Sequence, residues 1–263
     1  MIVSLRFLAA AIALSAACTF AAQPPLVPNP DFKLGADAPQ GWKLVGGAGR
    51  WIDGDVLEVS GDGKGSCHWE CAGAPLTPGA LYRFQFRGRQ VDGGGCIISG
   101  PSYANKDYPR LSEGWQWFGH VFRVPDGVGP ASLRLGQWET KGTVQFDAAR
   151  ITAAIPVHRP VGKLLLGEGE SIRGGKYTFA GTFSHPGTNF HRTLASAAAS
   201  FNSDRWCFGG GAQTTYRFGL PGCPFTSGEI SFTVNYRTAG GAVAELSRDG
   251  AAPPNETGSA SQA

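Results

Sequence analysis

The stretch Cys67–Cys71 (CHWEC) gathers thiols, an imidazole and a carboxylate within five residues, so it could act as a metal clip. A structural zinc site needs a second pair of ligands at a suitable spacing. The remaining histidines are scattered along the chain. The sequence therefore favours disulfides or buried thiols over a metal site here.

The other cysteines favour disulfide chemistry. Cys207 and Cys223 flank a hairpin-like stretch, and we expect them to form a disulfide. Among Cys67, Cys71 and Cys96 we expect one pair and one free thiol, with the pairing left open. Disulfides persist in exported proteins, so this expectation depends on export.

Catalytic patterns are weak throughout the chain. Gly181–Gly187 (GTFSHPG) lacks the Gly-x-Ser-x-Gly spacing of a nucleophile elbow. His185 and His191 have no acid between them, and Pro186 excludes a helix that could align the two rings. Twenty acidic residues could still include a glycosidase-like carboxylate pair. Because most of these acids lie beside glycine in turns, we favour surface roles over catalysis.

The elements that must position any site are short strands. The chain has 39 Gly, 18 Pro, 7 Trp and 16 Phe, a composition typical of strands joined by turns. The clearest strand is predicted over 81–89, where Tyr82, Phe84 and Phe86 point one way and Arg83, Gln85 and Arg87 the other. Further strands are predicted at residues 55–60, 115–124, 131–135 and 143–151.

We predict an all-β chain of two tandem antiparallel β-sandwiches, a jelly roll followed by a shorter, minimal or truncated unit. The predicted divisions are residues 23–154, a linker at 155–161, a second unit at 162–250 and a disordered tail at 251–263. In the second unit, Ile230–Tyr236 alternates apolar and polar residues as a strand does. Thr193–Ala199 could form one or two helical turns.

The first 22 residues have the layout of a cleavable signal peptide. Arg6 precedes an apolar run that is too short to span a bilayer, and small residues follow it. We therefore expect a secreted, periplasmic or extracellular protein without a membrane span, with lipid anchoring at Cys18 as a minor alternative. The net charge of +3 argues against nucleic acid as a partner.

Three stretches of residues 23–154 resemble the carbohydrate-binding modules attached to xylanases and cellulases, which form a galactose-binding-like jelly roll. These stretches are Asn29–Trp42 (Asn-x-x-Phe … Pro-x-x-Trp), Trp115–Pro125 (Trp-x-x-Phe-x-x-x-Phe-x-Val-Pro) and Gly142–Ile151 (Gly-Thr-Val-x-Phe-Asp-x-x-x-Ile). The family usually shows two acids in the last stretch, whereas here the second position is Ala148.

The resemblance implies polysaccharide binding without catalysis. Flat aromatic side chains can stack on the apolar faces of sugar rings, while polar neighbours bond the hydroxyls. The resemblance assigns Trp42 and Trp115 to the core. The candidate binding residues are Trp51, Trp69, Tyr103, Trp117 and Trp138, with Arg87 and Gln116 as polar partners.

The resemblance also implies a structural calcium ion, with Asp147 as a carboxylate ligand and backbone oxygens near Asn29 assisting. Calcium takes six to eight oxygen ligands, and one acid supplies few of them. The alternative is an aspartate in a salt bridge or capping a turn. For function as a whole, the alternatives are the N-terminal part of a secreted glycan-processing enzyme, or a cell-surface adhesion or structural module.

Overall fold

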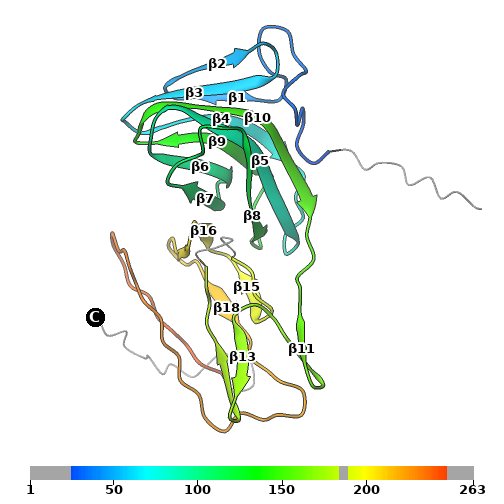
Figure 1. Ribbon diagram of the computed structural model, residues 1–263. Coiled ribbons are helices and arrows are strands. Elements are labelled where there is room, and N and C mark those ends of the chain that lie inside the picture. The colour runs from blue at the N-terminus through cyan, green and yellow to red at the C-terminus, as the bar shows by residue number, and fades with distance from the viewer. Residues whose placement is uncertain (1–24, 184–188, 248–263) are drawn as a thin grey trace, which may run out of the picture.

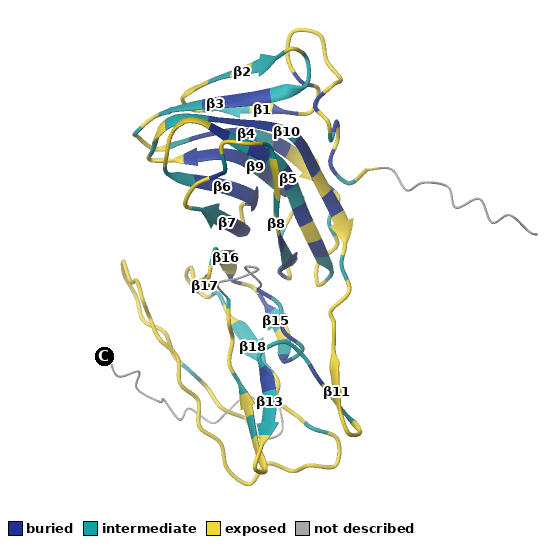
Figure 2. Cartoon of the chain, in the orientation of Figure 1, coloured by how far each residue is buried: buried dark blue, intermediate teal, exposed yellow. Residues whose placement is uncertain are grey.

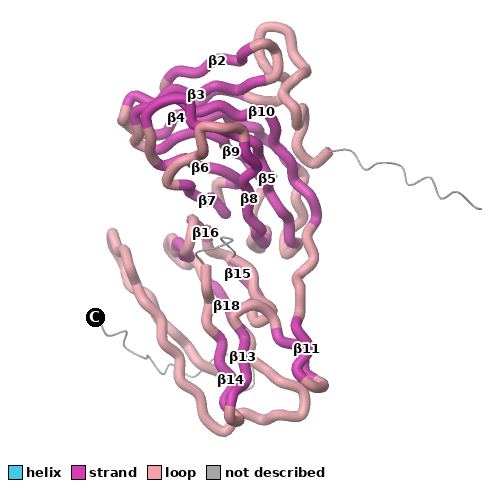
Figure 3. Tube along the Cα trace, viewed as in Figure 1, coloured by secondary structure: helices cyan, strands magenta, loops and turns pink. Residues whose placement is uncertain are grey.

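The computed structural model describes residues 25–183 and 189–247 (Figure 1). Within these ranges all regular structure is β-strand and no helix occurs (Figure 3), which confirms the all-β prediction. The described part of the chain accordingly holds no helix with the length and hydropathy of a membrane span. The predicted signal peptide, the predicted tail and Ser184–Gly187 of the serine–histidine motif lie outside the described residues.

Two sheets form the larger body of the fold. The seven-stranded sheet has the order β1 (Lys43–Val45), β4 (Ser66–Ala74), β9 (Ala131–Trp138), β6 (Cys96–Pro101), β7 (Ala104–Tyr108), β16 (Ser200–Asn202) and β17 (Arg205–Cys207). The five-stranded sheet has the order β2 (Ala48–Ile52), β3 (Val56–Asp62), β10 (Lys141–Ala153), β5 (Leu81–Gly93) and β8 (Gln116–Arg123). The inner faces of both sheets contribute to one hydrophobic core, as in a β-sandwich.

Alternation along β5 divides the five-stranded sheet into two faces. Tyr82, Phe84 and Phe86 are buried in the core, while Arg83 is exposed and Arg87 is half-exposed. Figure 2 shows this alternation as dark and light bands along β5 and β10. The expected half-buried strand is therefore present, and its charged residues share the outer face of the sheet.

His120 holds the two sheets together beneath this face. Its ring is buried against Phe84 and Phe122, and its Nε2 lies 3.2 Å from the carbonyl oxygen of Ala104 in β7. Burial, which penalises the charged ring, lowers the pKa of His120 to about 4. The fold therefore requires a neutral imidazole at this position.

Acidification is expected to destabilise the fold through His120. The folded-state pKa lies below the usual 6.5, so this stability is fully present above pH 6.5 and is lost as pH falls toward 4. The loss corresponds to about 3 kcal/mol. Urea unfolding of His120→Gln should show a flatter pH dependence between pH 6.5 and 4 than the parent. His158→Gln, at an exposed histidine, should show the same pH dependence of unfolding as the parent. If His120→Gln also showed the parent's pH dependence, His120 would not be the source of the acid sensitivity.

The second unit is smaller and consists of short antiparallel pairs. They are β11 (Arg159–Val161) with β12 (Leu164–Leu166), β13 (Glu170–Arg173) with β14 (Lys176–Phe179), and β15 (Leu194–Ala197) with β18 (Thr214–Tyr216). The helical turn expected at Thr193–Ala199 is wrong. That segment contains β15, because its backbone pairs with β18 across about 20 residues of sequence.

The second unit also joins the sheet of the first. Strand β16 pairs in parallel with β7, and the amide of Phe201 donates to the carbonyl of Tyr103 over 2.7 Å. The Asn189 side chain bonds both the amide and the carbonyl of Arg123 at the end of β8. Figure 1 shows β16 directly below β7. The division of the chain at residues 155–161 stays a prediction.

The expected strand at Ile230–Tyr236 is not formed. These residues lie in an extended arm that has no strand over 230–236 (Figure 3), and Ile230, Phe232, Val234 and Tyr236 are all exposed. The alternation is real in the sequence, but a strand also needs a neighbour to accept its backbone hydrogen bonds. The described residues supply none at this position.

The described cysteines are all free thiols, so the predicted Cys207–Cys223 disulfide is not formed. Cys207 pairs through its backbone with Ser200 in the β16–β17 hairpin, whereas Cys223 closes a separate turn with Leu220, and both side chains are exposed. The pair expected among Cys67, Cys71 and Cys96 is not formed either, and Cys67 and Cys71 are buried free thiols. Burial raises the pKa of Cys71 to about 11, which keeps it protonated.

Candidate functional site

The outer face of the five-stranded sheet brings together arginine, tryptophan and amide side chains from five strands. Directly paired residues point to the same side of an antiparallel sheet, so the register defines cross-strand rows. Gln145 pairs with Arg89, and Arg87 pairs with Trp117. We call this surface the Arg–Trp face; it comprises Arg50, Glu58, Arg83, Gln85, Arg87, Arg89, Trp115, Trp117, Gln145 and Arg150.

One row of the Arg–Trp face is a continuous hydrogen-bond chain. Arg50 donates to Glu58 Oε1 at 2.6 and 2.9 Å, and Gln145 Nε2 donates to Glu58 Oε2 at 2.7 Å. Arg89 donates two hydrogen bonds to Gln145 Oε1, at 2.7 and 2.9 Å. Both oxygens of Glu58 and the oxygen of Gln145 are thus already engaged by neighbours within the face.

Trp115 supports two guanidinium groups. The guanidinium carbon of Arg89 lies 4.7 Å from the ring centroid of Trp115, and that of Arg87 lies 5.6 Å from it. Guanidinium groups stack on indole rings through cation–π attraction. Trp115 is therefore a half-buried platform on the face, and the prediction that it lies in the core is wrong. Trp42 is buried, as predicted.

Trp117 supports a third guanidinium group. The Arg150 guanidinium of β10 lies 4.8 Å from the Trp117 ring, reaching it across β5. Gly119 lies beside Gln85 in this region, and a Cβ there would come within 2.6 Å of a backbone oxygen of Phe84. Trp117 remains 45 % exposed after this stacking, so part of its surface is open to a ligand.

The predicted binding residues separate into two groups in the structure. Trp117 and Arg87 come together on the Arg–Trp face, whereas the exposed Gln116 pairs with Gly88 and points to the opposite side of the sheet. Trp138 is 48 % exposed but belongs to β9 of the other sheet. Trp51 is half-buried and packs against the core.

Trp69 and Tyr103 are buried, which corrects their expected place on a binding surface. Trp69 points between the sheets, where its indole N–H donates to the backbone oxygen of Glu58 at 3.0 Å. The Tyr103 ring lies against Phe122 in the core, and the Tyr103 carbonyl accepts a hydrogen bond from the amide of Phe201, almost one hundred residues later. Local sequence could not reveal that long-range contact.

Asp147 forms a salt bridge with Arg87 over 3.2 Å and leaves Oδ1 buried without a hydrogen-bond partner. Burial raises the pKa of Asp147; Arg87 opposes the shift, and Asp55 and Asp31 add to it. No three His, Cys, Asp or Glu side chains of the described residues converge as metal ligands. Oδ2 of the Asp147 carboxylate is thus engaged by Arg87, and the calcium ion expected at Asp147 stays a prediction.

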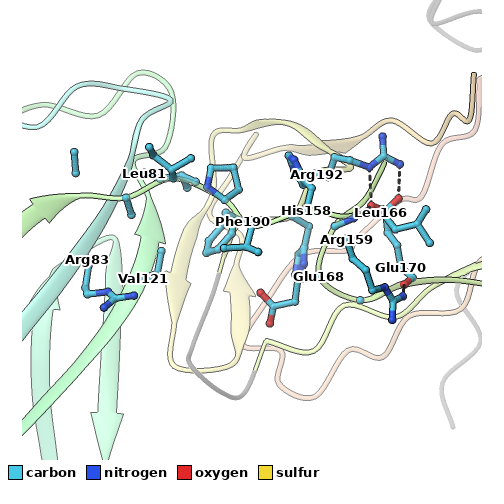
Figure 4. A pocket seen from close by; sticks show the side chains of 18 of the residues that line it. Leu81, Arg83, Val121, His158, Arg159, Leu166, Glu168, Glu170, Phe190 and Arg192 are labelled. Atoms are coloured by element: carbon cyan, nitrogen blue, oxygen red, sulfur yellow. Dashed lines mark hydrogen bonds and ion pairs between the residues drawn. The ribbon is translucent and has the colours of Figure 1, made fainter. Parts of the chain in front are cut away.

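A groove of about 870 Å³ continues the Arg–Trp face toward the second unit. Arg83 and Val121 line one wall, and Glu168, Phe190 and Arg192 line the other (Figure 4). The 155–159 connection closes one side of the groove. Burial raises the pKa of Glu168 in this groove.

Glu170 fixes the second wall of the groove. Its buried carboxylate accepts hydrogen bonds from Arg192, from the Tyr177 hydroxyl at 2.6 Å and from the Gly167 amide at 2.5 Å (Figure 4 marks the Arg192 pair). Burial alone would raise the pKa of Glu170, but these hydrogen bonds and the Arg192 charge outweigh it and lower the pKa. The wall is therefore held by an ionised, fully bonded carboxylate.

Sequence reasoning missed Arg50, Glu58, Arg89, Gln145 and Arg150, which make up half of the face. One signal was available. The predicted strand at residues 81–89 already placed Arg83, Gln85 and Arg87 on one side, and the same alternation extends to Arg89. The partners from β2, β3 and β10 required the register of the sheet.

No protein-family profile matches the chain, and the comparison with curated proteins finds no match. Several solved structures resemble it. One is described as CBM4 (17 % identity, 43 % of this chain and 79 % of that one, TM-score 0.35). Another is the second N-terminal cellulose-binding domain of β-1,4-glucanase C from Cellulomonas fimi (16 % identity, 52 % of this chain and 98 % of that one, TM-score 0.38).

A third is a xylan-binding CBM22 domain from Paenibacillus barcinonensis (12 % identity, 49 % of this chain and 94 % of that one, TM-score 0.37). The structures that resemble this chain thus include carbohydrate-binding modules, the kind of protein that its motifs resemble.

Proposed function

We propose that this chain is an exported, non-catalytic protein that binds polysaccharide along the Arg–Trp face. The observation that carries the proposal is the combination, on one open sheet face, of indole rings with guanidinium and amide groups that are already held in place. Sugar recognition needs flat apolar surface for the ring and fixed polar groups for its substituents. Both are present side by side.

The dimensions of the sheet suit an extended ligand. The face crosses five strands, and adjacent strands lie about 4.8 Å apart. Its residues lie in cross-strand rows and lead into the groove beside Arg83. An oligosaccharide can therefore contact several rows at once, and the groove provides a place for one end of the bound segment.

Hydrolysis of the glycan is the competing function. It requires a pair of carboxylates, one of them free to act as an acid. On the Arg–Trp face Glu58 has both oxygens bonded by Arg50 and Gln145, and the neighbouring Asp147 is paired with Arg87. The carboxylates near the indoles thus serve to position arginines, which supports binding over catalysis.

Trp117→Ala is expected to weaken polysaccharide binding roughly tenfold, because loss of an aromatic contact costs about 1 kcal/mol or more. Trp138→Ala is the matched control, since Trp138 is about as exposed but lies on the other sheet. Affinity electrophoresis against a panel of soluble polysaccharides measures both variants. Equal weakening by the two substitutions would place the site elsewhere, and absence of binding to every polysaccharide would overturn the proposal.

A further inference from the structure

The Arg–Trp face carries more positive than negative charge. It holds five arginines, Arg50, Arg83, Arg87, Arg89 and Arg150. Three of them have a carboxylate within 4 Å, namely Glu58, Asp147 and Asp31. Among the described residues, Arg83 and Arg89 have no carboxylate partner at that distance, although the chain as a whole is only weakly basic.

The hydrogen-bonding capacity of the face is equally one-sided. A neutral sugar hydroxyl both donates and accepts, so its recognition uses acceptors as well as donors. Here the Glu58 oxygens accept from Arg50 and Gln145, and the Gln145 oxygen accepts from Arg89. Gln85 adds an amide to the face. The other polar groups that remain available are mainly guanidinium N–H groups, which match a ligand group that only accepts.

Two of the arginines, Arg89 and Arg150, are also held in place by stacking on indole rings. Arg89 stacks on Trp115 and is bonded through its Nε and Nη2 to Gln145, which fixes the plane of its guanidinium. Arg150 is similarly stacked on Trp117. A planar guanidinium that is already oriented binds carboxylate or sulfate oxygens with little further loss of side-chain entropy.

Arg83 extends this chemistry into the groove. It pairs with Thr152 and Val121 across the sheet and lines the groove wall opposite Phe190 (Figure 4). Arg83 and Arg89 lie on the same face of β5, six residues apart, so they are separated by about 20 Å along the strand. Two such positions can engage charged groups on different sugars of one chain.

From these observations we infer that the ligand is an anionic polysaccharide, whose carboxylate or sulfate groups bind at Arg83 and Arg89. The inference rests on the proposed function and narrows it to one chemical class of glycan. The indoles remain available for the sugar rings, and the guanidinium groups supply the selectivity.

Matched pairs of ligands test the inference. Polygalacturonate and its methyl ester share a backbone but differ in carboxylate charge, and dextran sulfate and dextran differ in sulfate. We expect the full chain to bind at least one anionic member ten times or more tightly than its neutral counterpart, with affinity falling as NaCl rises from 50 to 300 mM. The pair that shows the difference identifies carboxylate or sulfate as the preferred group.

The variant Arg83→Gln/Arg89→Gln should reduce binding of the anionic member at least tenfold and bring the ratio of anionic to neutral affinity close to one. Arg173→Gln, on an exposed strand residue of the second unit, is the matched control and should bind like the parent. Circular dichroism and thermal unfolding of each variant confirm folding.

Three results would overturn the inference. Equal affinity for the charged and neutral members, with loss in Trp117→Ala, would leave the proposed function standing and remove the anionic ligand. Binding of single-stranded DNA as tight as that of the anionic polysaccharide would show attraction to any polyanion. A chain that binds none of the four polysaccharides would refute both proposals.

Discussion

Trp115→Ala is expected to weaken polysaccharide binding by about two orders of magnitude, the largest effect of any single substitution on the Arg–Trp face. The indole supports both Arg87 and Arg89, so its removal releases two guanidinium groups from their fixed positions. Each immobilised long side chain costs about 0.5–1.5 kcal/mol to order, and the lost cation–π contacts add to this. Isothermal titration calorimetry with the best polysaccharide of the panel measures the change.

Trp115→Phe is the informative comparison, because it keeps an aromatic platform of smaller area. Its affinity should fall between those of the parent and Trp115→Ala. Trp115 is only half-buried, so both variants should stay folded, with thermal unfolding close to that of the parent. If Trp115→Ala bound as tightly as the parent, orientation of the arginines by Trp115 would have no role in binding.

Glu170→Ala is expected to lower the free energy of unfolding of the second unit by about 3 kcal/mol or more. The substitution leaves the partly buried Arg192 without its partner and removes the acceptor for Tyr177 and for the Gly167 amide. Breaking a buried ion pair from one side is costly because the remaining charge is uncompensated. Urea unfolding followed by tryptophan fluorescence, with Trp206 as the reporter in this unit, measures the loss.

The pH dependence of this unit gives an independent measurement. The folded-state pKa of Glu170 lies below its usual value near 4.5, so the stability it contributes is present above pH 4.5 and is lost as pH falls further. Glu170→Ala should remove that part of the acid sensitivity. Glu168 lies two residues away and forms no ion pair among the described residues. Glu168→Ala should therefore have a free energy of unfolding in urea close to that of the parent. Equal loss in the two variants would contradict a specific role for Glu170.

The alternation of Tyr82, Phe84 and Phe86 against arginine and glutamine predicted the central strand and its polar face, because a period of two is a local property of the sequence. The hydrogen-bond chain from Arg50 to Arg89 could not be predicted in the same way. It depends on which strands become neighbours, and β10, which lies between β3 and β5 in the sheet, is far from both in the sequence. Trp115 shows a further limit, since a family motif suggested a core residue where the fold places a platform.

In the second unit, the sequence pattern predicted a strand that the structure does not contain. Ile230–Tyr236 has the pattern of a strand but no partner for it among the described residues, so local pattern alone overestimated order there. Tyr103 was expected on a binding surface, yet it is buried and its backbone bonds the distant Phe201. Both errors concern pairing over long sequence distances.

The parallel pairing of β16 with β7 means that the second unit is attached at two places, through the 155–161 connection and through this edge of the sheet. A body attached at one point can swing, whereas a body attached at two well-separated points has little freedom to rotate. The distance between Arg83 and Phe190 across the groove is then set by the folded protein itself. A glycan entering the groove would meet walls already in position and would not have to supply free energy for closing them.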